Sequence, residues 1–167
     1  GRNNGEQTPK KNWSLEEARG KLETYCSYQE RCLWELRRKL FEKGIQGQAV
    51  DTILAELEAS GFVDEERFAR SYARGKFRIK KWGKGRITQE LKGRQISSAL
   101  IQLGLTEIDG DEYFATLERE AEKKWEKTKE KDAYKKKYLV THYLMSKGFE
   151  QDLIQEALSA LISQGME

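Results

Sequence analysis

The chain has 167 residues, a formal charge of +3, 37 % hydrophobic and 35 % charged residues. This length suits one domain or a few small units in a row, and the composition supports only the thin core of a helical or elongated protein. No apolar run approaches the roughly eighteen residues of a membrane-spanning helix, and the polar start lacks the apolar segment of a signal peptide. We therefore expect a cytoplasmic protein, with residues 1–13 as a disordered tail and Cys26 and Cys32 as reduced thiols.

The first predicted unit, residues 14–61, contains three amphipathic helices. Its first helix starts at Ser14-Leu-Glu-Glu17, which has the pattern of a capping box. The second helix ends before Gly44 and the third ends at Gly61, and glycine is the residue most often found just past a helix end. Arg37 and Arg38 on the second helix are either part of a binding surface or ordinary solvated side chains.

The second predicted unit, residues 62–105, contains most of the positive charge. Residues 67–94 include 11 basic side chains and one acidic side chain, Glu90. Asp64 is predicted to cap the first helix of this unit, and basic residues recur along that helix every three or four positions. They form one predicted basic stripe, which consists of Arg67, Arg70, Arg74, Arg78 and Lys81. The neighbouring stripe is predicted to pack against the core and consists of Phe68, Tyr72, Gly75 and Ile79.

The segment after this helix reads "WGKGRITQELKGR" (82–94). Its glycines lack the spacing of a phosphate-binding loop, so we interpret residues 83–85 as a turn between two helices. Trp82 either contacts a partner or covers the core between the helices. Further cations extend the positive charge onto the second helix, namely Lys84, Arg86, Lys92 and Arg94.

The third predicted unit, residues 106–167, has a second basic cluster at 123–137, where eight lysines are interleaved with three acidic residues. Their spacing is typical of a solvated helix, with a secondary role in binding. His142 has no second histidine at metal-binding spacing and is predicted to be a core or boundary residue. Acidic residues at 64–66 and 109–112 stand at predicted helix starts, where they offset the helix dipole, and we prefer this interpretation to a Mg²⁺ site. We predict no catalytic residue, no cofactor and no metal.

The three units are similar to one another in sequence. The segment "ELRRKLFEKGI" (35–45) aligns with "RITQELKGRQI" (86–96) and with "LVTHYLMSKGF" (139–149). The alignment places apolar residues at equivalent positions, namely Leu40, Leu91 and Leu144, followed by Ile45, Ile96 and Phe149. We therefore predict an all-α fold of three tandem three-helix repeats, each helix-turn-helix-like, stacked into an elongated right-handed or curved array.

Over about residues 20–163 these repeats resemble the RecX family, bacterial regulators of the RecA recombinase. The stretches that carry the resemblance are "FVDEERFARSYARGK", "GKGRITQELKGRQI" and "ELRRKLFEKGI". The chain departs from the family pattern at Gln95, where the family often has glycine, and at Lys84-Gly85, where a proline frequently follows the linker glycine. The first helix of the third unit is also unusually rich in lysine.

The resemblance implies a non-enzymatic monomer that binds the RecA–DNA filament. It would inhibit or modulate the recombinase, ATPase and coprotease activities of RecA in DNA repair, homologous recombination and the SOS response. The basic residues are predicted to contact RecA or single- or double-stranded DNA. The alternative is a direct DNA-binding helix-turn-helix module, which the uncharged starts of the last helices, "QGQAVD" and "ISSALI", disfavour. The predicted partner-binding residues are Arg70, Arg74, Arg78, Lys80, Lys81, Trp82, Lys84, Arg86, Arg94, Arg37 and Arg38.

Overall fold

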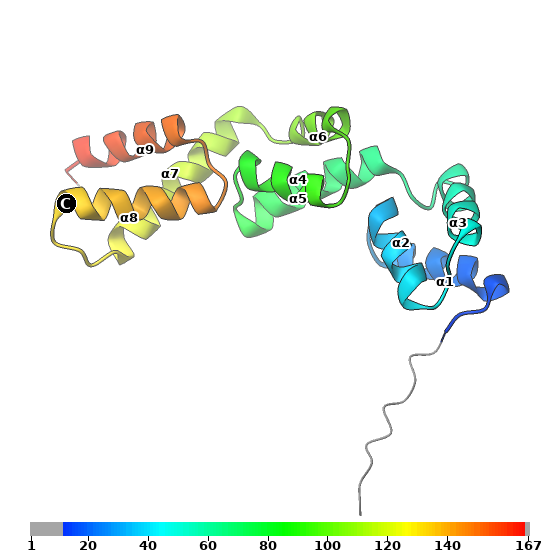
Figure 1. The fold of residues 1–167 in the computed structure, drawn as a ribbon. Helices are drawn as coiled ribbons and strands as arrows, with labels where there is room; N and C mark the ends of the chain where they lie inside the picture. The colour runs from blue at the N-terminus through cyan, green and yellow to red at the C-terminus, as the bar shows by residue number, and fades with distance from the viewer. Residues whose placement is uncertain (1–11, 166–167) are drawn as a thin grey trace, which may run out of the picture. The chain divides into compact units, whose positions relative to one another are not determined.

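The computed structural model describes residues 12–165. Within that range all regular structure is helical, with nine α-helices and no strand, so the predicted all-α class is confirmed. The chain divides into two compact units, of which the first ends at Phe68 and the second begins at Ala69 (Figure 1). Each unit is described by itself.

The first unit is built from helices α1 (Leu15–Tyr28), α2 (Leu33–Glu42) and α3 (Gln48–Ala59), and α3 packs against both of the others (Figure 1). The predicted capping box of Ser14 and Glu17 is present at the start of α1. The core between the helices is aliphatic and consists of Ala18, Leu22, Leu36, Leu40, Ile45, Val50, Ile53, Leu54, Leu57 and Val63.

The predicted tail meets this core at its last residue. Residues 1–11 lie outside the described part of the chain. Trp13 packs against the core, and its backbone N–H donates a hydrogen bond to the carbonyl oxygen of Lys43 at 3.0 Å. Trp13 is therefore part of the packed unit and not of a disordered tail, because its ring covers apolar surface that would otherwise face water.

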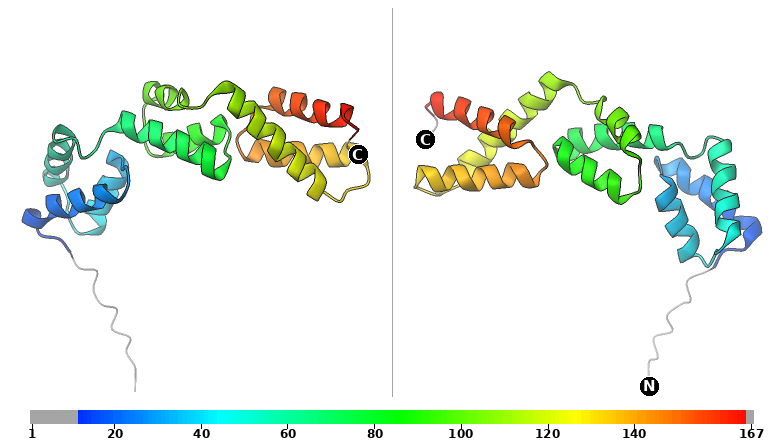
Figure 2. Two further views of the ribbon diagram at one scale, coloured as in Figure 1. Left: turned by 180° about the vertical axis from the view of Figure 1, so that it is seen from behind. Right: turned by 45° about the horizontal axis from the view of Figure 1, so that its top comes forward.

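The second unit contains most of α4 and five further helices. The helices are α4 (Glu65–Lys80), α5 (Lys84–Gly93), α6 (Ser98–Leu105), α7 (Gly110–Lys127), α8 (Ala133–Ser146) and α9 (Gln151–Ser163). The last three pack against one another in all pairs, and both views of Figure 2 show them side by side. Asp109 caps α7 by accepting from the backbone N–H of Glu112, as expected of an acidic residue at a helix start.

The packed face of α4 differs from the prediction. The predicted packed stripe includes Ile79, but 79 % of its surface is exposed, whereas Ala73 and Phe77 are buried together with Phe68. The core therefore lies against the Ala69–Ala73–Phe77 face of the helix. Hydrophobicity alone predicts that Ile79 is buried. Whether it is buried depends on its angular position around the helix, because the neighbouring helices determine which side of α4 faces the core.

The turn after α4 also lies two residues earlier than predicted. The connection comprises residues 81–83, and Lys84 and Gly85 already belong to α5. Lys81 leaves the helical conformation with a φ of 57°, in the left-handed region that a lysine rarely adopts. Lys81 therefore does not continue the basic stripe of α4 at helical spacing.

One turn recurs after the second helix of each repeat. A backbone N–H donates to the carbonyl oxygen five residues earlier, from Ile45 to Leu40 (2.9 Å), from Ile96 to Leu91 (3.1 Å) and from Phe149 to Leu144 (3.2 Å). The residue before each donor has a positive φ, at Gly44 (84°), Gln95 (59°) and Gly148 (100°). This is the Schellman pattern of a helix end, and it recurs at the positions that the sequence alignment made equivalent.

Gln95 is the one non-glycine residue among these three left-handed positions. Replacing Gln95 with glycine is expected to raise the free energy of unfolding by about 0.5–1 kcal/mol, because the relief of left-handed strain outweighs the added entropy of the unfolded glycine. Urea unfolding followed by circular dichroism measures this change. As a control, Lys92→Gly in the exposed helical part of α5 should destabilise by about 1 kcal/mol. A Gln95→Gly variant less stable than the parent would contradict the expectation.

The two cysteines are free, as predicted, and burial raises the pKa of the Cys32 thiol to about 12. Within residues 12–165, no helix combines the length and the apolar character needed to cross a membrane.

Candidate binding face on the middle repeat

The first half of the predicted basic stripe is paired within the protein. Arg70 and Arg74 each form an ion pair of 3.3 Å with Glu107, which lies in the connection between α6 and α7. Arg67, in the first unit, pairs with Glu30 at 2.7 Å and also donates to the carbonyl oxygen of Gly61. These arginines therefore contribute to packing between helices, and the stripe is not uniformly open to a partner.

A different set of side chains forms a continuous surface feature, which we call the cation–aromatic row. Its two rings are Tyr72 and Trp82. The Lys76 Nζ lies 5.4 Å from the centre of the Tyr72 ring and 5.1 Å from that of Trp82. The guanidinium carbon of Arg94 lies 5.0 Å from the Tyr72 ring and that of Arg86 4.3 Å from the Trp82 ring. Along the row the order is Arg94, Tyr72, Lys76, Trp82 and Arg86.

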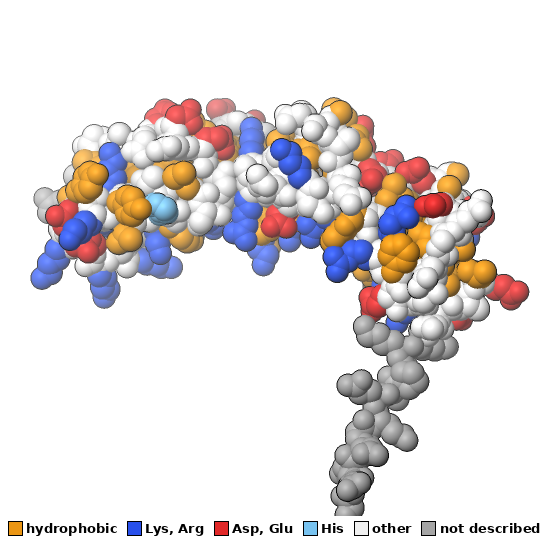
Figure 3. All heavy atoms as spheres, in the orientation of Figure 1, with side chains coloured by type: hydrophobic (Ala, Val, Ile, Leu, Met, Phe, Trp, Pro, Cys, Tyr) orange, Lys and Arg blue, Asp and Glu red, His pale blue; other side chains and the backbone are white. Residues whose placement is uncertain are grey.

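The row holds three cations in fixed positions on a packed scaffold. Each ring lies between two cations, and a cation over an exposed ring gains about 0.5–1 kcal/mol. A guanidinium that lies over a ring can direct N–H groups to carboxylate or phosphate oxygens. Glu90 forms an ion pair of 3.3 Å with Arg94 and offsets part of the charge. In Figure 3, Lys and Arg side chains gather along the lower edge of α4 and α5.

The structure thus brings three predicted residues together, Trp82, Arg86 and Arg94, and adds two that the prediction missed. The predicted basic stripe does not include Lys76, and Tyr72 belongs to the stripe that the sequence predicts to pack. Their four-residue spacing in "YARGK" places them on one side of α4, and this pattern could have identified them.

The remaining predicted residues are not members of the row. Arg78 and Lys80 are exposed on α4. Arg78 is two residues from Lys76 and so about 200° around the helix axis from it, whereas Lys80 is four residues from Lys76 and lies on the same side of α4. In the first unit, Arg37 pairs with Asp51 at 3.0 Å, and the guanidinium carbon of Arg38 lies 4.5 Å from the Trp34 ring centre.

The N-terminus of α5 is occupied by the third repeat. Gly83 and Gly85 donate backbone hydrogen bonds of 2.7 and 2.9 Å to the carbonyl oxygens of Lys147 and Gly148, in the turn between α8 and α9. The backbone N–H of Lys84 donates to the Tyr113 hydroxyl at 3.0 Å. These glycines therefore join two repeats and do not form a phosphate cradle.

Tyr113 connects the three parts of this joint. Its hydroxyl donates to a carboxylate oxygen of Glu150, and its ring packs against Phe77 and Phe149. Burial and the bond to the Glu150 carboxylate raise the pKa of Tyr113, so the phenol stays protonated at neutral pH. Lys84, predicted to face a partner, has its Nζ 5.0 Å from the centre of the Tyr113 ring.

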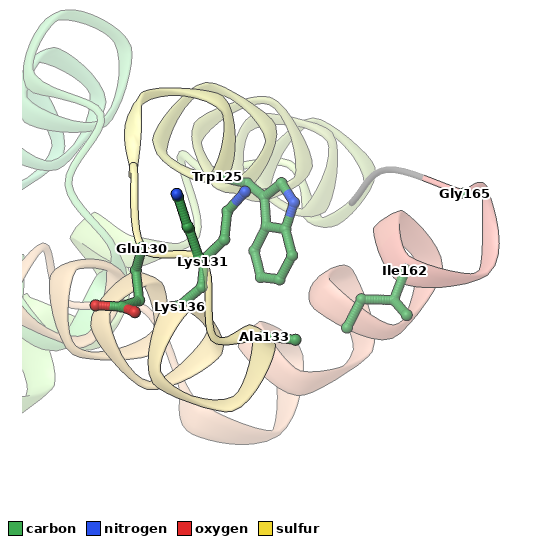
Figure 4. A pocket seen from close by; sticks show the side chains of 7 residues that line it. All are labelled: Trp125, Glu130, Lys131, Ala133, Lys136, Ile162 and Gly165. Atoms are coloured by element: carbon green, nitrogen blue, oxygen red, sulfur yellow. The ribbon is translucent and has the colours of Figure 1, made fainter.

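A cavity of about 670 Å³ lies in the third repeat, between the end of α7, the start of α8 and the end of α9 (Figure 4). Its wall includes the ring of Trp125, with the Lys136 Nζ 4.5 Å from the ring centre, and Ile162 on the opposite side. The lining offers no nucleophile beside a base. Among the described residues no three His, Cys, Asp or Glu side chains gather as metal ligands. His142 is exposed, so its prediction as a core or boundary residue is wrong.

Fold and site together define a class of protein: tandem three-helix repeats that present a basic, aromatic-lined face. Comparison with known proteins agrees. Residues 64–105 match the family model "RecX, second three-helix domain", and residues 111–158 match "RecX, third three-helix domain". The chain is 30 % identical to regulatory protein RecX of Pelodictyon phaeoclathratiforme over 133 residues, which covers 80 % of this chain and 81 % of the relative.

A second relative, regulatory protein RecX of Enterococcus faecalis, is 37 % identical over 140 residues, and the match spans 82 % of this chain and 52 % of the relative. The crystal structure of RecX from Lactobacillus salivarius shares the fold, with a TM-score of 0.77 at 21 % identity over 88 % of this chain and 96 % of that one. The chain belongs to the RecX family of regulatory proteins. The predicted architecture of three tandem three-helix repeats is confirmed.

Proposed function

We propose that this protein is a non-enzymatic regulator that binds the RecA–DNA filament as a monomer and inhibits or modulates its recombinase, ATPase and coprotease activities. The observation that carries the proposal is the cation–aromatic row, which holds Lys76, Arg86 and Arg94 on a packed scaffold in a family of regulatory proteins. A filament of protein on DNA presents carboxylates and phosphates, which such cations bind. With such a partner, the protein would act in the cytoplasm, in recombination, DNA repair and the SOS response.

A direct sequence reader of DNA is less well supported. A helix-turn-helix reader places polar and basic residues of its last helix in the major groove. The last helices of the three repeats, α3, α6 and α9, contain no Lys or Arg at all. Positive charge lies instead on α4 and α5. We propose that the chain divides into repeats at 14–61, 62–105 and 106–167. The middle repeat, which contains α4 and α5, would bind the RecA–DNA filament.

Addition of this protein to RecA on single-stranded DNA is expected to reduce DNA-stimulated ATP hydrolysis and strand exchange. The protein should also sediment with the filaments, and this fraction should fall as salt rises, because ion pairs are screened and counterions are released on binding. The proposal would be contradicted if a several-fold excess of this protein over RecA produced no inhibition and no co-sedimentation.

A further inference from the structure

An aromatic stripe runs along α8 in the third repeat, on the side away from the core. It consists of Tyr134, Tyr138, His142 and Met145, which are four, four and three residues apart. At 100° per residue these positions fall within about 80° of one another around the helix axis. The buried residues of the helix, Val140 and Leu144, lie on the other side.

The stripe is more exposed than apolar side chains of a packed helix normally are. Tyr134 exposes 82 % of its surface and Tyr138 58 %, and Met145 and the flanking Leu139 are exposed as well. The His142 ring lies 4.6 Å from the Tyr138 ring, centre to centre, with the two ring planes tilted by 47°. Figure 3 shows the pale-blue histidine of α8 flanked by hydrophobic side chains on the open face. Contiguous exposed apolar surface of this kind marks an interaction site.

Positive charge outweighs negative charge around the stripe. Helix α8 contains three lysines and no Asp or Glu, although Lys136 lies over the Trp125 ring and the exposed Asp132 caps the helix. Lys135 lines a groove of about 330 Å³ together with Tyr134, Tyr138 and Leu139. The one acid in that lining, Glu130, accepts a hydrogen bond from the backbone N–H of Asp132. Exposed Lys131 stands just before the helix.

We propose that this stripe is a binding site for single-stranded nucleic acid, separate from the cation–aromatic row. Rings at one-turn spacing of about 6 Å can each stack on a base of an extended strand, and the neighbouring lysines can contact its phosphates. The bases of a duplex are stacked on one another and offer no free faces to these rings. The proposal concerns the chain alone and does not depend on its action on RecA.

Other occupants fit the observations less well. A second copy of this chain would bring two sets of lysines together, and like charges repel. The core of a protein–protein interface is depleted in lysine, whereas here Lys135 lines the groove itself. Proteins that bind single-stranded nucleic acid combine exposed aromatic rings with neighbouring basic side chains, as this stripe does.

The test is fluorescence anisotropy of labelled oligonucleotides with the full chain and no RecA. The strands are dT₂₀, U₂₀, an abasic strand of the same length and a duplex. We expect dT₂₀ and U₂₀ to bind alike, since both sugars leave the base faces free, and the abasic strand and the duplex to bind at least about fivefold more weakly. Equal affinity for dT₂₀ and the abasic strand would overturn the proposal, as would the absence of binding to dT₂₀ at low salt.

Two double variants separate stacking from structure. Tyr134→Ala with Tyr138→Ala should weaken dT₂₀ binding about tenfold or more, whereas Tyr134→Phe with Tyr138→Phe should keep it, because phenylalanine retains the ring. Ile79→Ala, which removes an exposed apolar side chain from α4, is the matched control and should leave binding unchanged. An alanine variant with unaltered helicity and parental affinity, or equal loss in the Ile79 control, would overturn the proposal. Inhibition of RecA, measured on the same variants, is a separate readout.

Discussion

Replacing Gly83 with alanine is expected to lower the free energy of unfolding of the second unit by at least about 2–3 kcal/mol. A Cβ atom on Gly83 would stand 2.3 Å from the carbonyl carbon of Gly148 and 2.4 Å from the backbone nitrogen of Phe149. Because both contacts are with backbone, no side-chain rotation can relieve them. The joint must open, and the 2.7 Å hydrogen bond from Gly83 to Lys147 breaks with it. Urea unfolding followed by circular dichroism measures the loss of stability.

Gly93→Ala is the control for this variant. Gly83 stands directly before α5 and Gly93 is the last residue of that helix, but a Cβ on Gly93 meets no heavy atom within 4 Å. Alanine in a helical position is favoured over glycine by about 0.5–1 kcal/mol, so this variant should be more stable than the parent. If Gly83→Ala and Gly93→Ala were equally stable, the close approach of the second and third repeats would not exist in solution.

The repeat pattern could be predicted from sequence because each helix end is a local structure. The capping box at Ser14 and the turn glycines Gly44 and Gly61 act on residues within one helical turn of themselves. The leucines at 40, 91 and 144 are fully buried in the structure. Their equivalence follows from their positions in the aligned sequence segments, and no contact between distant residues is needed to recognise it.

The binding face could be predicted only in part because its contacts join distant residues. Glu107 is 33 residues beyond Arg74 in the chain, and no local pattern pairs them. Tyr113 binds the backbone of Lys84 from a similar distance and turns a residue predicted to meet a partner into part of a joint. The same holds for Ile79, because the side of α4 that packs depends on where α5 and α6 lie. Lys76 and Tyr72 are the exception, since four-residue spacing is local.

Reversing two charges of the cation–aromatic row, with Lys76→Glu and Arg86→Glu together, is expected to weaken inhibition of RecA strongly. Both cations flank Trp82, at 5.1 and 4.3 Å from the ring centre, so the change replaces two of the three positive charges of the row with negative ones. Against a polyanionic filament, attraction becomes repulsion. We expect the concentration for half-inhibition of ATP hydrolysis to rise about tenfold or more, which corresponds to about 1.4 kcal/mol of binding free energy.

The matched control is Lys123→Glu with Lys127→Glu, which makes the same change in net charge on exposed positions of α7. It should retain most of the inhibition, because it leaves the row intact. Circular dichroism should show equal helicity for both variants. If the row binds DNA phosphates, its reversal also lowers the dependence of log affinity on log salt by about 0.7–0.9 for each phosphate that the protein no longer neutralises. Equal loss of inhibition in the α7 variant would mean that net charge, and not the placement of cations around Trp82, governs binding.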